Sequence, residues 1–308
     1  MKEVITISFG KGANWTSAHF WEIQEKSQED QEFHSPLFIE GQTGYCPRLV
    51  AVDFKEKVDL SQLYSKEEEV PWAGKVQTFE VQPSSVPKWS DLIINMLDLK
   101  NIVVAYEMYG AEGFEDSFRW VAEHSDSAQG IQFLWDNEMV QEIPGALEVV
   151  SDYYNKVPIL GLGFSYKYST EEALLLSELK DYSQFLHVPC TKAQESTHYQ
   201  EVAEGLEVIS YHCRFKEDMR TALAEFLTLS TGNMASLSVN ENFYGPCQNP
   251  IYRKDYFHEV CGTASLHTDT EFYNFISEFI KPPSHNYDPE EVTEANNYLK
   301  DLRENFTQ

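Results

Sequence analysis

The sequence predicts an α/β fold in which a doubly wound and mostly parallel sheet carries helices on both faces, with a reduced α+β C-terminal part. Short apolar runs rich in β-branched residues alternate with helical patterns over about the first 190 of 308 residues. These runs are apolar along their whole length, as in strands buried on both faces. The alternation then stops, so we predict an N-terminal domain over 1–190 and a central helix, a reduced second domain and C-terminal helices over 191–308.

The first elements follow in chain order. Residues 4–9 form an apolar run that predicts a buried strand, and Gly10 to Gly12 interrupt it before a helix over 13–25. Residues 49–54 (LVAVDF) predict a second strand. Ser90 is a candidate N-cap for the next helix, and residues 102–106 (IVVAY) predict the strand after it.

The same alternation continues to the end of the first domain. A helix marked by Phe114, Phe118 and Val121 precedes a strand over 130–135, and a further helix begins near Pro144. A strand over 157–164 is followed by a helix that opens with the capping-box pattern Ser169 to Glu172. In the second part we expect a helix around 219–227, a strand over 236–239, a helix around 272–279 and a last helix from Asp288.

Charge is the outstanding compositional feature. The chain has 23 Lys and Arg residues against 50 Asp and Glu residues, a formal net charge of −27. A surface this acidic repels phosphate backbones and anionic lipid head groups. The composition therefore argues against nucleic-acid binding and against docking to a membrane through a basic patch.

Cysteine and histidine usage argues against disulfide frameworks and metal sites. The five cysteines are an odd number, are widely spaced and form no C-x-x-C pair. His212 beside Cys213 is the one close pair, and two adjacent ligands do not make a metal site. The N-terminus lacks the apolar core of a secretory signal and the Arg-rich pattern of a transit peptide, and we see no membrane helix. These features predict a cytoplasmic protein.

Three motifs resemble those of tubulins, in the same order. The opening MKEVITISFGKGANWTSAHFWEIQ resembles their first strand, glycine loop and F-W-E helix. Residues 45–53 (YCPRLVAVD) resemble the Y-x-P-R strand, and residues 129–133 (QGIQF) resemble the Q-G-F-Q-L strand. Together they imply a member of the tubulin/FtsZ superfamily and its fold.

Within that superfamily the chain resembles the Misato family, which is tied to mitochondrial distribution and inheritance. The resemblance rests on residues 19–21 (HFW), 41–49 (GQTGYCPRL), 89–92 (WSDL) and 130–136 (GIQFLWD). A weaker likeness covers about 255–305. The chain is shorter than typical members, and we place the shortfall between about 190 and 255, where the second domain is expected to be reduced.

The resemblance also implies where a nucleotide would sit. Gly10, Lys11, Gly12 and Asn14 are the candidate residues of a vestigial nucleotide loop, in which glycines would let backbone N–H groups approach phosphates. Trp15 replaces a residue that tubulins use there. The next loop, residues 135–142 (WDNEMVQE), has no glycine and places Asp136 and Glu138 where phosphates would lie. We therefore predict no cofactor, no metal and no enzymatic activity.

Other features have simple structural explanations that compete with functional ones. Ser165 in GLGFS lacks a G-x-G-x-x-G context and is interpreted as a strand-end turn. Asp53 is either a magnesium ligand or, as we favour, a cap for nearby backbone. Residues 67–69 (EEE) are a solvated run or a docking segment for a basic partner, and the aromatics of 243–257 are core or an interaction surface.

Two functional hypotheses, with a weaker third, follow from the resemblance. The favoured one is a non-catalytic tubulin-like protein that acts through protein contacts in mitochondrial distribution, morphology and inheritance. The alternatives are a GTP-binding, polymerising tubulin-like GTPase and a cofactor of tubulin folding or assembly. The partners expected are proteins, with tubulin or the chaperonin machinery and a mitochondrial surface protein as candidates, and no membrane insertion. The expected location is the cytoplasm, peripheral at the mitochondrial outer surface.

Overall fold

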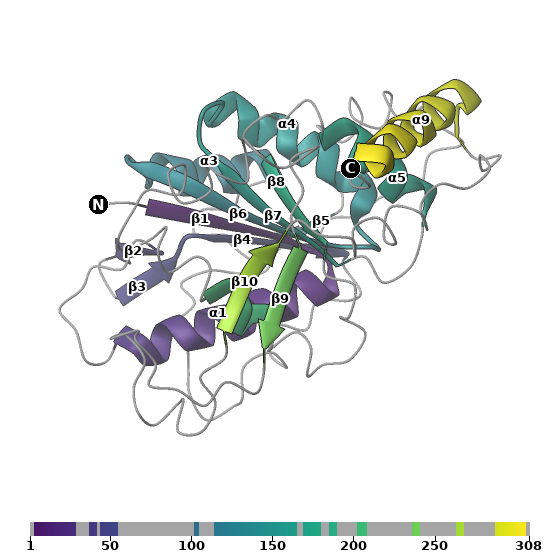
Figure 1. Cartoon of the computed structure of the whole chain (residues 1–308). Helices are drawn as coiled ribbons and strands as arrows, with labels where there is room; N and C mark the ends of the chain where they lie inside the picture. The colour runs from purple at the N-terminus through teal and green to yellow at the C-terminus, as the bar shows by residue number, and fades with distance from the viewer. Residues whose placement is uncertain are drawn as a thin grey trace.

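A six-stranded sheet forms the centre of the protein (Figure 1). The computed structural model describes residues 3–28, 37–41, 44–54, 102–104, 114–164, 169–179, 185–189, 202–207, 236–240, 263–267 and 287–305. The strands lie in the order β5-β4-β1-β6-β7-β8. Their bounds are β1 Glu3–Phe9, β4 Leu49–Phe54, β5 Ile102–Val104, β6 Ala128–Asp136, β7 Ile159–Phe164 and β8 Phe185–Pro189.

This strand order is that of a doubly wound fold. Strands β4, β1, β6, β7 and β8 pair in parallel, and β5 joins β4 in antiparallel fashion. The chain leaves β1 toward one side of the sheet and later returns to its other side as β6, so the order reverses between β1 and β6. Open sheets of this kind bind ligands at the carboxyl ends of the strands beside that reversal. The predicted mixed α/β fold class is confirmed.

Helices cover both faces of the sheet (Figure 1). Helix α1 (Lys11–Gln28) lies against one face, and α3 (Phe114–Glu123), α4 (Ile143–Tyr153) and α5 (Thr170–Leu179) lie on the other. The residues of β1 alternate between the two sides. Ile5, Ile7 and Phe9 join the large apolar cluster formed with α3, α4 and α5. On the other side of β1, Thr6 bonds Gln132 of β6 and Ser8 bonds Asn14 of α1.

The C-terminal helix returns to the first part of the molecule. Helix α9 (Pro289–Asn305) packs on α5 and contributes Val292, Ala295, Leu299 and Leu302 to the same apolar cluster. Strands β9 (Ser236–Asn240) and β10 (Thr263–His267) form an antiparallel pair, and residues 202–207 are helical. The boundary that we place near residue 190 stays a prediction. No helix in the part of the chain that the structure describes is long and apolar enough to span a bilayer.

The structure differs from the sequence-based expectations in several details. The first helix begins at Lys11 rather than residue 13 and continues to Gln28. A short 3-10 helix, η2 (Val140–Glu142), precedes α4, and the hairpin of β2 (Phe38–Gly41) and β3 (Gly44–Pro47) was not predicted. The expected helices near Ser90, at 219–227 and at 272–279 lie outside the described residues, as do Ser165, residues 67–69 and the aromatics of 243–257.

Candidate functional site

The candidate site lies where β1, α1 and β6 meet. Gly10 joins β1 to α1 with a positive φ of 88°, a backbone conformation that favours glycine. Its N–H donates to the carbonyl oxygen of Val52 at 2.8 Å, and its own carbonyl accepts the N–H of Asn14 at 2.9 Å. The turn therefore places the first amides of α1 at the carboxyl edge of the sheet, as the glycine pattern predicts.

A carboxylate of the same chain occupies this helix start. Asp136 is the last residue of β6, and its Oδ2 accepts the N–H of Gly12 at 2.8 Å. Its Oδ1 accepts the N–H of Glu138 at 2.8 Å, which closes a local turn after the strand. Asp136 is 3% exposed, and a Cβ built on Gly10 would lie 3.0 Å from its Cγ. An internal anion thus sits against the amides that a bound anion would use.

Asn14 also has internal partners. Its Oδ1 accepts the hydroxyl of Ser8 at 2.7 Å, and its Nδ2 donates to the carbonyl oxygen of Val52 at 3.0 Å. These bonds tie α1 to the ends of β1 and β4, and Asn14 is 6% exposed. Of the four candidate loop residues, the structure thus brings Gly10, Gly12 and Asn14 together. Lys11 is the first residue of α1, and its side chain lies outside the described atoms.

The two acids predicted to oppose phosphate have different positions. Asp136 points at the glycine turn, whereas Glu138 is exposed at the surface. The sequence therefore identified the acid that fills the site but assigned the same role to a second acid. Asp53, proposed as a magnesium ligand or a cap, lies in β4 opposite Val103, and its side chain is outside the described atoms.

Further acids are buried near the same edge. Glu172 is 1% exposed in the first turn of α5, and burial together with the charge of Asp136 raises its pKa well above the usual value. Glu142, at the end of η2, is 8% exposed, and burial raises its pKa to about 7. The Ser169 hydroxyl caps α5 by accepting the N–H of Glu172 at 3.1 Å, as the capping pattern predicts. Within the described residues, no three His, Cys, Asp or Glu side chains are placed to hold a metal ion.

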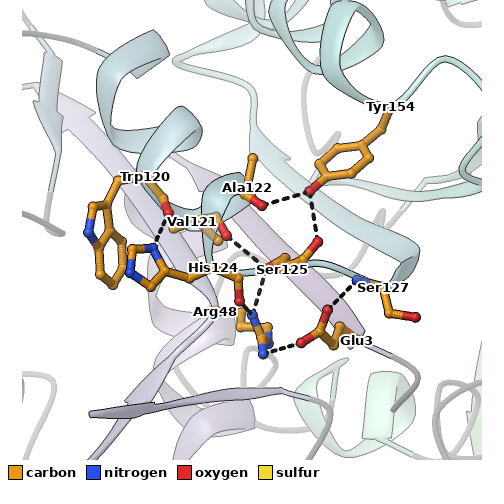
Figure 2. Close-up of polar contacts among 9 residues, drawn as sticks. All are labelled: Glu3, Arg48, Trp120, Val121, Ala122, His124, Ser125, Ser127 and Tyr154. Carbon is orange, nitrogen blue, oxygen red and sulfur yellow. Dashed lines mark hydrogen bonds and ion pairs between the residues drawn. The ribbon is translucent and has the colours of Figure 1, made fainter. Parts of the chain in front are cut away.

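The opposite, amino edge of the sheet is organised around Arg48 (Figure 2). Its guanidinium contacts the Glu3 carboxylate at 2.5 Å and donates to the Ser125 hydroxyl at 2.6 Å and to the carbonyl oxygen of His124. The other oxygen of Glu3 accepts the N–H of Ser127 at 2.7 Å. We name Arg48, Glu3, His124, Ser125 and Ser127 the arginine clasp. It joins the starts of β1 and β4 to the turn between α3 and β6.

Neighbouring groups hold that turn in place. The hydroxyl of Ser125 donates to the carbonyl oxygen of Val121 at 2.7 Å, and the hydroxyl of Tyr154 approaches the carbonyl oxygens of Ala122 and Ser125 at 3.3 and 3.4 Å (Figure 2). The sequence pattern singled out Arg48 as part of Y-x-P-R but gave it no role. Its partners are a distant acid and backbone carbonyls, so local sequence carried no signal for them.

Comparison with known proteins matches this N-terminal part of the chain. Residues 2–96 match the family described as the Misato Segment II tubulin-like domain. This segment, about a third of the chain, is therefore similar to a Misato tubulin-like domain. Protein misato homolog 1 of Danio rerio is 28% identical over an alignment of 103 residues, which covers 27% of this chain and 17% of that protein. The predicted resemblance to the Misato family is therefore confirmed, and the chain matches only a small share of that relative's length.

The segment that matches the Misato family contains part of the candidate site. The matched segment contains the glycine turn, Asn14 and Arg48, and the residue that fills the turn, Asp136, lies beyond it. The segment thus supplies helix N–H donors and the paired arginine, while β6 supplies the internal anion. The sequence analysis did not single out Glu142, and it assigned Glu172 only a capping role. The local sequence around each of these acids gives no sign that its side chain is buried.

Proposed function

We propose that this protein is a non-catalytic, tubulin-like member of the Misato group that acts through protein contacts in mitochondrial distribution, morphology and inheritance. The observation that supports the non-catalytic part is the bond between Asp136 Oδ2 and the Gly12 N–H at 2.8 Å. An anionic phosphate would have to displace a buried carboxylate from the amide that it needs, against the repulsion of like charges. The mitochondrial role comes from the resemblance to the Misato family.

The neighbouring groups strengthen the argument against tight GTP binding. Asp136 fills the space beside Gly10 that the missing side chain leaves, because a Cβ added to Gly10 would lie 3.0 Å from the Asp136 Cγ. Asn14 is engaged with Ser8 and Val52 rather than turned toward an open site. A GTP-dependent polymerising protein, our alternative, would need this set of bonds to rearrange. The second alternative, a cofactor of tubulin folding or assembly, needs no nucleotide and makes the same prediction at this site.

A nucleotide titration tests the non-catalytic part. We expect the wild-type protein to show no saturable binding of a fluorescent GTP analogue below about 10 μM, an affinity worth roughly 7 kcal/mol. Asp136→Ala removes the internal anion, and Glu138→Gln removes an exposed acid of the same loop as a matched control. If the carboxylate of Asp136 is what excludes GTP, the first variant binds more tightly than the second. Saturation by the wild type, or sedimentable polymer on GTP addition, would defeat the proposal.

A fractionation experiment tests the location. We place the protein in the cytoplasm and at the mitochondrial outer surface, held there by a protein partner. Protease added to intact mitochondria should then remove the bound fraction, and high salt should release it without detergent because the chain carries a net charge of −27. A fraction protected from protease would contradict the location. Affinity capture followed by mass spectrometry separates the partner classes: tubulin or chaperonin subunits favour the folding alternative, and a mitochondrial surface protein favours the main proposal.

A further inference from the structure

The C-terminal helix lies over one corner of the carboxyl edge. Helix α9 rests on α5 beside the large apolar cluster (Figure 1). Its buried residues follow helical spacing, with Val292, Ala295, Leu299 and Leu302 on one side. Among the described elements, α5 is its main neighbour. The helix is therefore held to the molecule along one face.

Tyr287, just before α9, ties this helix to two loops of the carboxyl edge. Its hydroxyl donates to Glu171 Oε1 at 2.6 Å and accepts from Gln141 Nε2 at 2.9 Å. Gln141 belongs to η2 and Glu171 to the first turn of α5. Tyr287 is 7% exposed, and its partners Gln141 and Glu171 are partly buried. The segment that leads into α9 thus closes over the start of both α4 and α5.

Two acids are buried at these same helix starts. Among the described residues, Glu142 Oε2 and Glu172 Oε2 have no hydrogen-bond partner. Burying an ionised carboxylate with one oxygen left without a donor is costly, and for Glu142 this cost outweighs a backbone hydrogen bond that favours the ionised form. Both side chains are therefore more stable as neutral acids while the edge is closed. The raised pKa values of both groups have this cause first, and the charge of Asp136 adds to it for Glu172.

We propose that α9 with Tyr287 is a proton-linked strap, which stays seated while Glu142 and Glu172 are neutral and loosens when they ionise. The described groups that interact with these acids are a backbone hydrogen-bond partner and Tyr287 at Glu142, and Asp136 at Glu172, with Glu171 bonded to Tyr287. These groups are neutral or anionic, so ionisation finds no compensating charge among them. Helices α4 and α5 pack on the six-stranded sheet on their other side. The strap is therefore the element that can move away from the two acids.

The direction with pH follows from linkage. A carboxyl group that titrates at about 7 when covered and near 4.5 when exposed binds its proton more tightly in the closed form. Raising the pH therefore favours the open form. For Glu142 alone, the opening equilibrium should increase about tenfold between about pH 6 and about pH 8, and Glu172 adds to this change.

Hydrogen exchange on the full-length protein tests the strap. Amides of 289–305 are followed by mass spectrometry at about pH 6 and about pH 8, after correction for intrinsic exchange rates. We expect protection to fall by about tenfold or more at the higher pH, while amides of β1 and β6 keep their protection. Equal protection of α9 at the two pH values would overturn the proposal.

Matched variants connect the effect to the two acids. Residue 142 is neutral at every pH in Glu142→Gln, so this variant should lack the roughly tenfold loss of protection that Glu142 causes. The double variant Glu142→Gln with Glu172→Gln should make the protection of α9 independent of pH. Glu294→Gln, on the exposed side of α9, should keep the wild-type response. If the double variant does not fold, the single variant decides. An unchanged pH response in Glu142→Gln would overturn the role of this acid, whatever the nucleotide titration shows.

Discussion

The two edges of the sheet each contain a buried charged side chain, but they treat it differently. At the amino edge, the guanidinium of Arg48 meets the carboxylate of Glu3 and accepting oxygens from the turn at 124–125. At the carboxyl edge, Asp136 receives backbone N–H groups and lies near a second acid, Glu172. The first edge balances charge with opposite charge, which favours stability. The second gathers acidic groups, so the ionisation of these groups, and with it the stability of this edge, depends on pH.

The largest expected effect comes from breaking the arginine clasp. Arg48 is only 6% exposed. Arg48→Met removes the cation but leaves its partners, the Glu3 carboxylate and two oxygens of the turn, in place. Removing one partner of a buried ion pair costs about 3–5 kcal/mol. Urea unfolding should therefore show a large fall in the midpoint with little change in slope.

The control for this variant is a surface pair. Arg119 contacts Asp116 on the exposed side of α3, so Arg119→Gln should leave the urea midpoint unchanged within error. An Arg48→Met protein as stable as the wild type would show that the amino edge does not depend on its charge pair, and the contrast between the edges would disappear.

The second effect concerns pH and belongs to the carboxyl edge. Below about pH 4.5 Glu142 is protonated in both the folded and unfolded states, and between about 4.5 and about 7 only the folded state keeps the proton. The free energy of unfolding should therefore fall as the pH rises through this window, by on the order of 3 kcal/mol from this group. Glu142→Gln should flatten that part of the profile.

The same pH profile sharpens the comparison when measured in the Arg48→Met background. The two edges lie at opposite ends of the strands, so their effects should add. We expect the variant to be less stable at every pH but to keep the slope that Glu142 causes. A slope that vanishes with Arg48 would mean that the edges are coupled.

The third effect tests how closely Asp136 fills the glycine turn. Gly10→Ala places a side chain at a φ of 88° and 3.0 Å from the Asp136 Cγ. We expect a loss of about 2 kcal/mol, within the range for a non-glycine residue in this region of backbone space. An Asp136→Ala background removes the contacts with Cγ and Oδ1 but keeps the one with Cβ at 3.2 Å. The loss should therefore be smaller, which a double-mutant cycle on urea unfolding measures. An equal loss in both backgrounds would mean that backbone strain alone explains it.

The sequence predicted the parts of this molecule that local patterns control. Apolar runs gave β1, β4, β6 and β7, and the helical periodicity with the Ser169 cap gave α5. The β2–β3 hairpin was missed although Gly41 and Gly44 stand at the facing ends of its two strands, and β8 was missed as well. The antiparallel direction of β5 depends on pairing with β4, which no local pattern reveals.

The sequence predicted which residues form the candidate site but not the contacts between them. The glycine turn and the acid at 136 were both identified, but their bond joins residues 124 positions apart in the sequence. The bonds of Tyr287 to Glu171 and Gln141 span 116 and 146 positions. Contacts over such distances follow from the packed sheet and from α9 returning to α5. Burial of Glu142 and Glu172 is likewise a result of packing, because acids at helix starts are usually exposed.

The last comparison concerns two tyrosines, one at each edge. Tyr154 approaches two carbonyl oxygens at 3.3 and 3.4 Å, beyond the usual range of strong hydrogen bonds, whereas Tyr287 makes bonds of 2.6 and 2.9 Å, one of them to a carboxylate. Tyr287→Phe should cost about 1.5–3 kcal/mol, and Tyr154→Phe less than about 1 kcal/mol. Both variants keep the aromatic ring, including the edge contact of Tyr154 with Phe118, so the difference reports on the hydroxyls alone. Urea unfolding of the pair measures it. If Tyr154→Phe costs as much as Tyr287→Phe, the hydroxyl at the amino edge contributes more than its distances indicate, and the arginine clasp extends to α4.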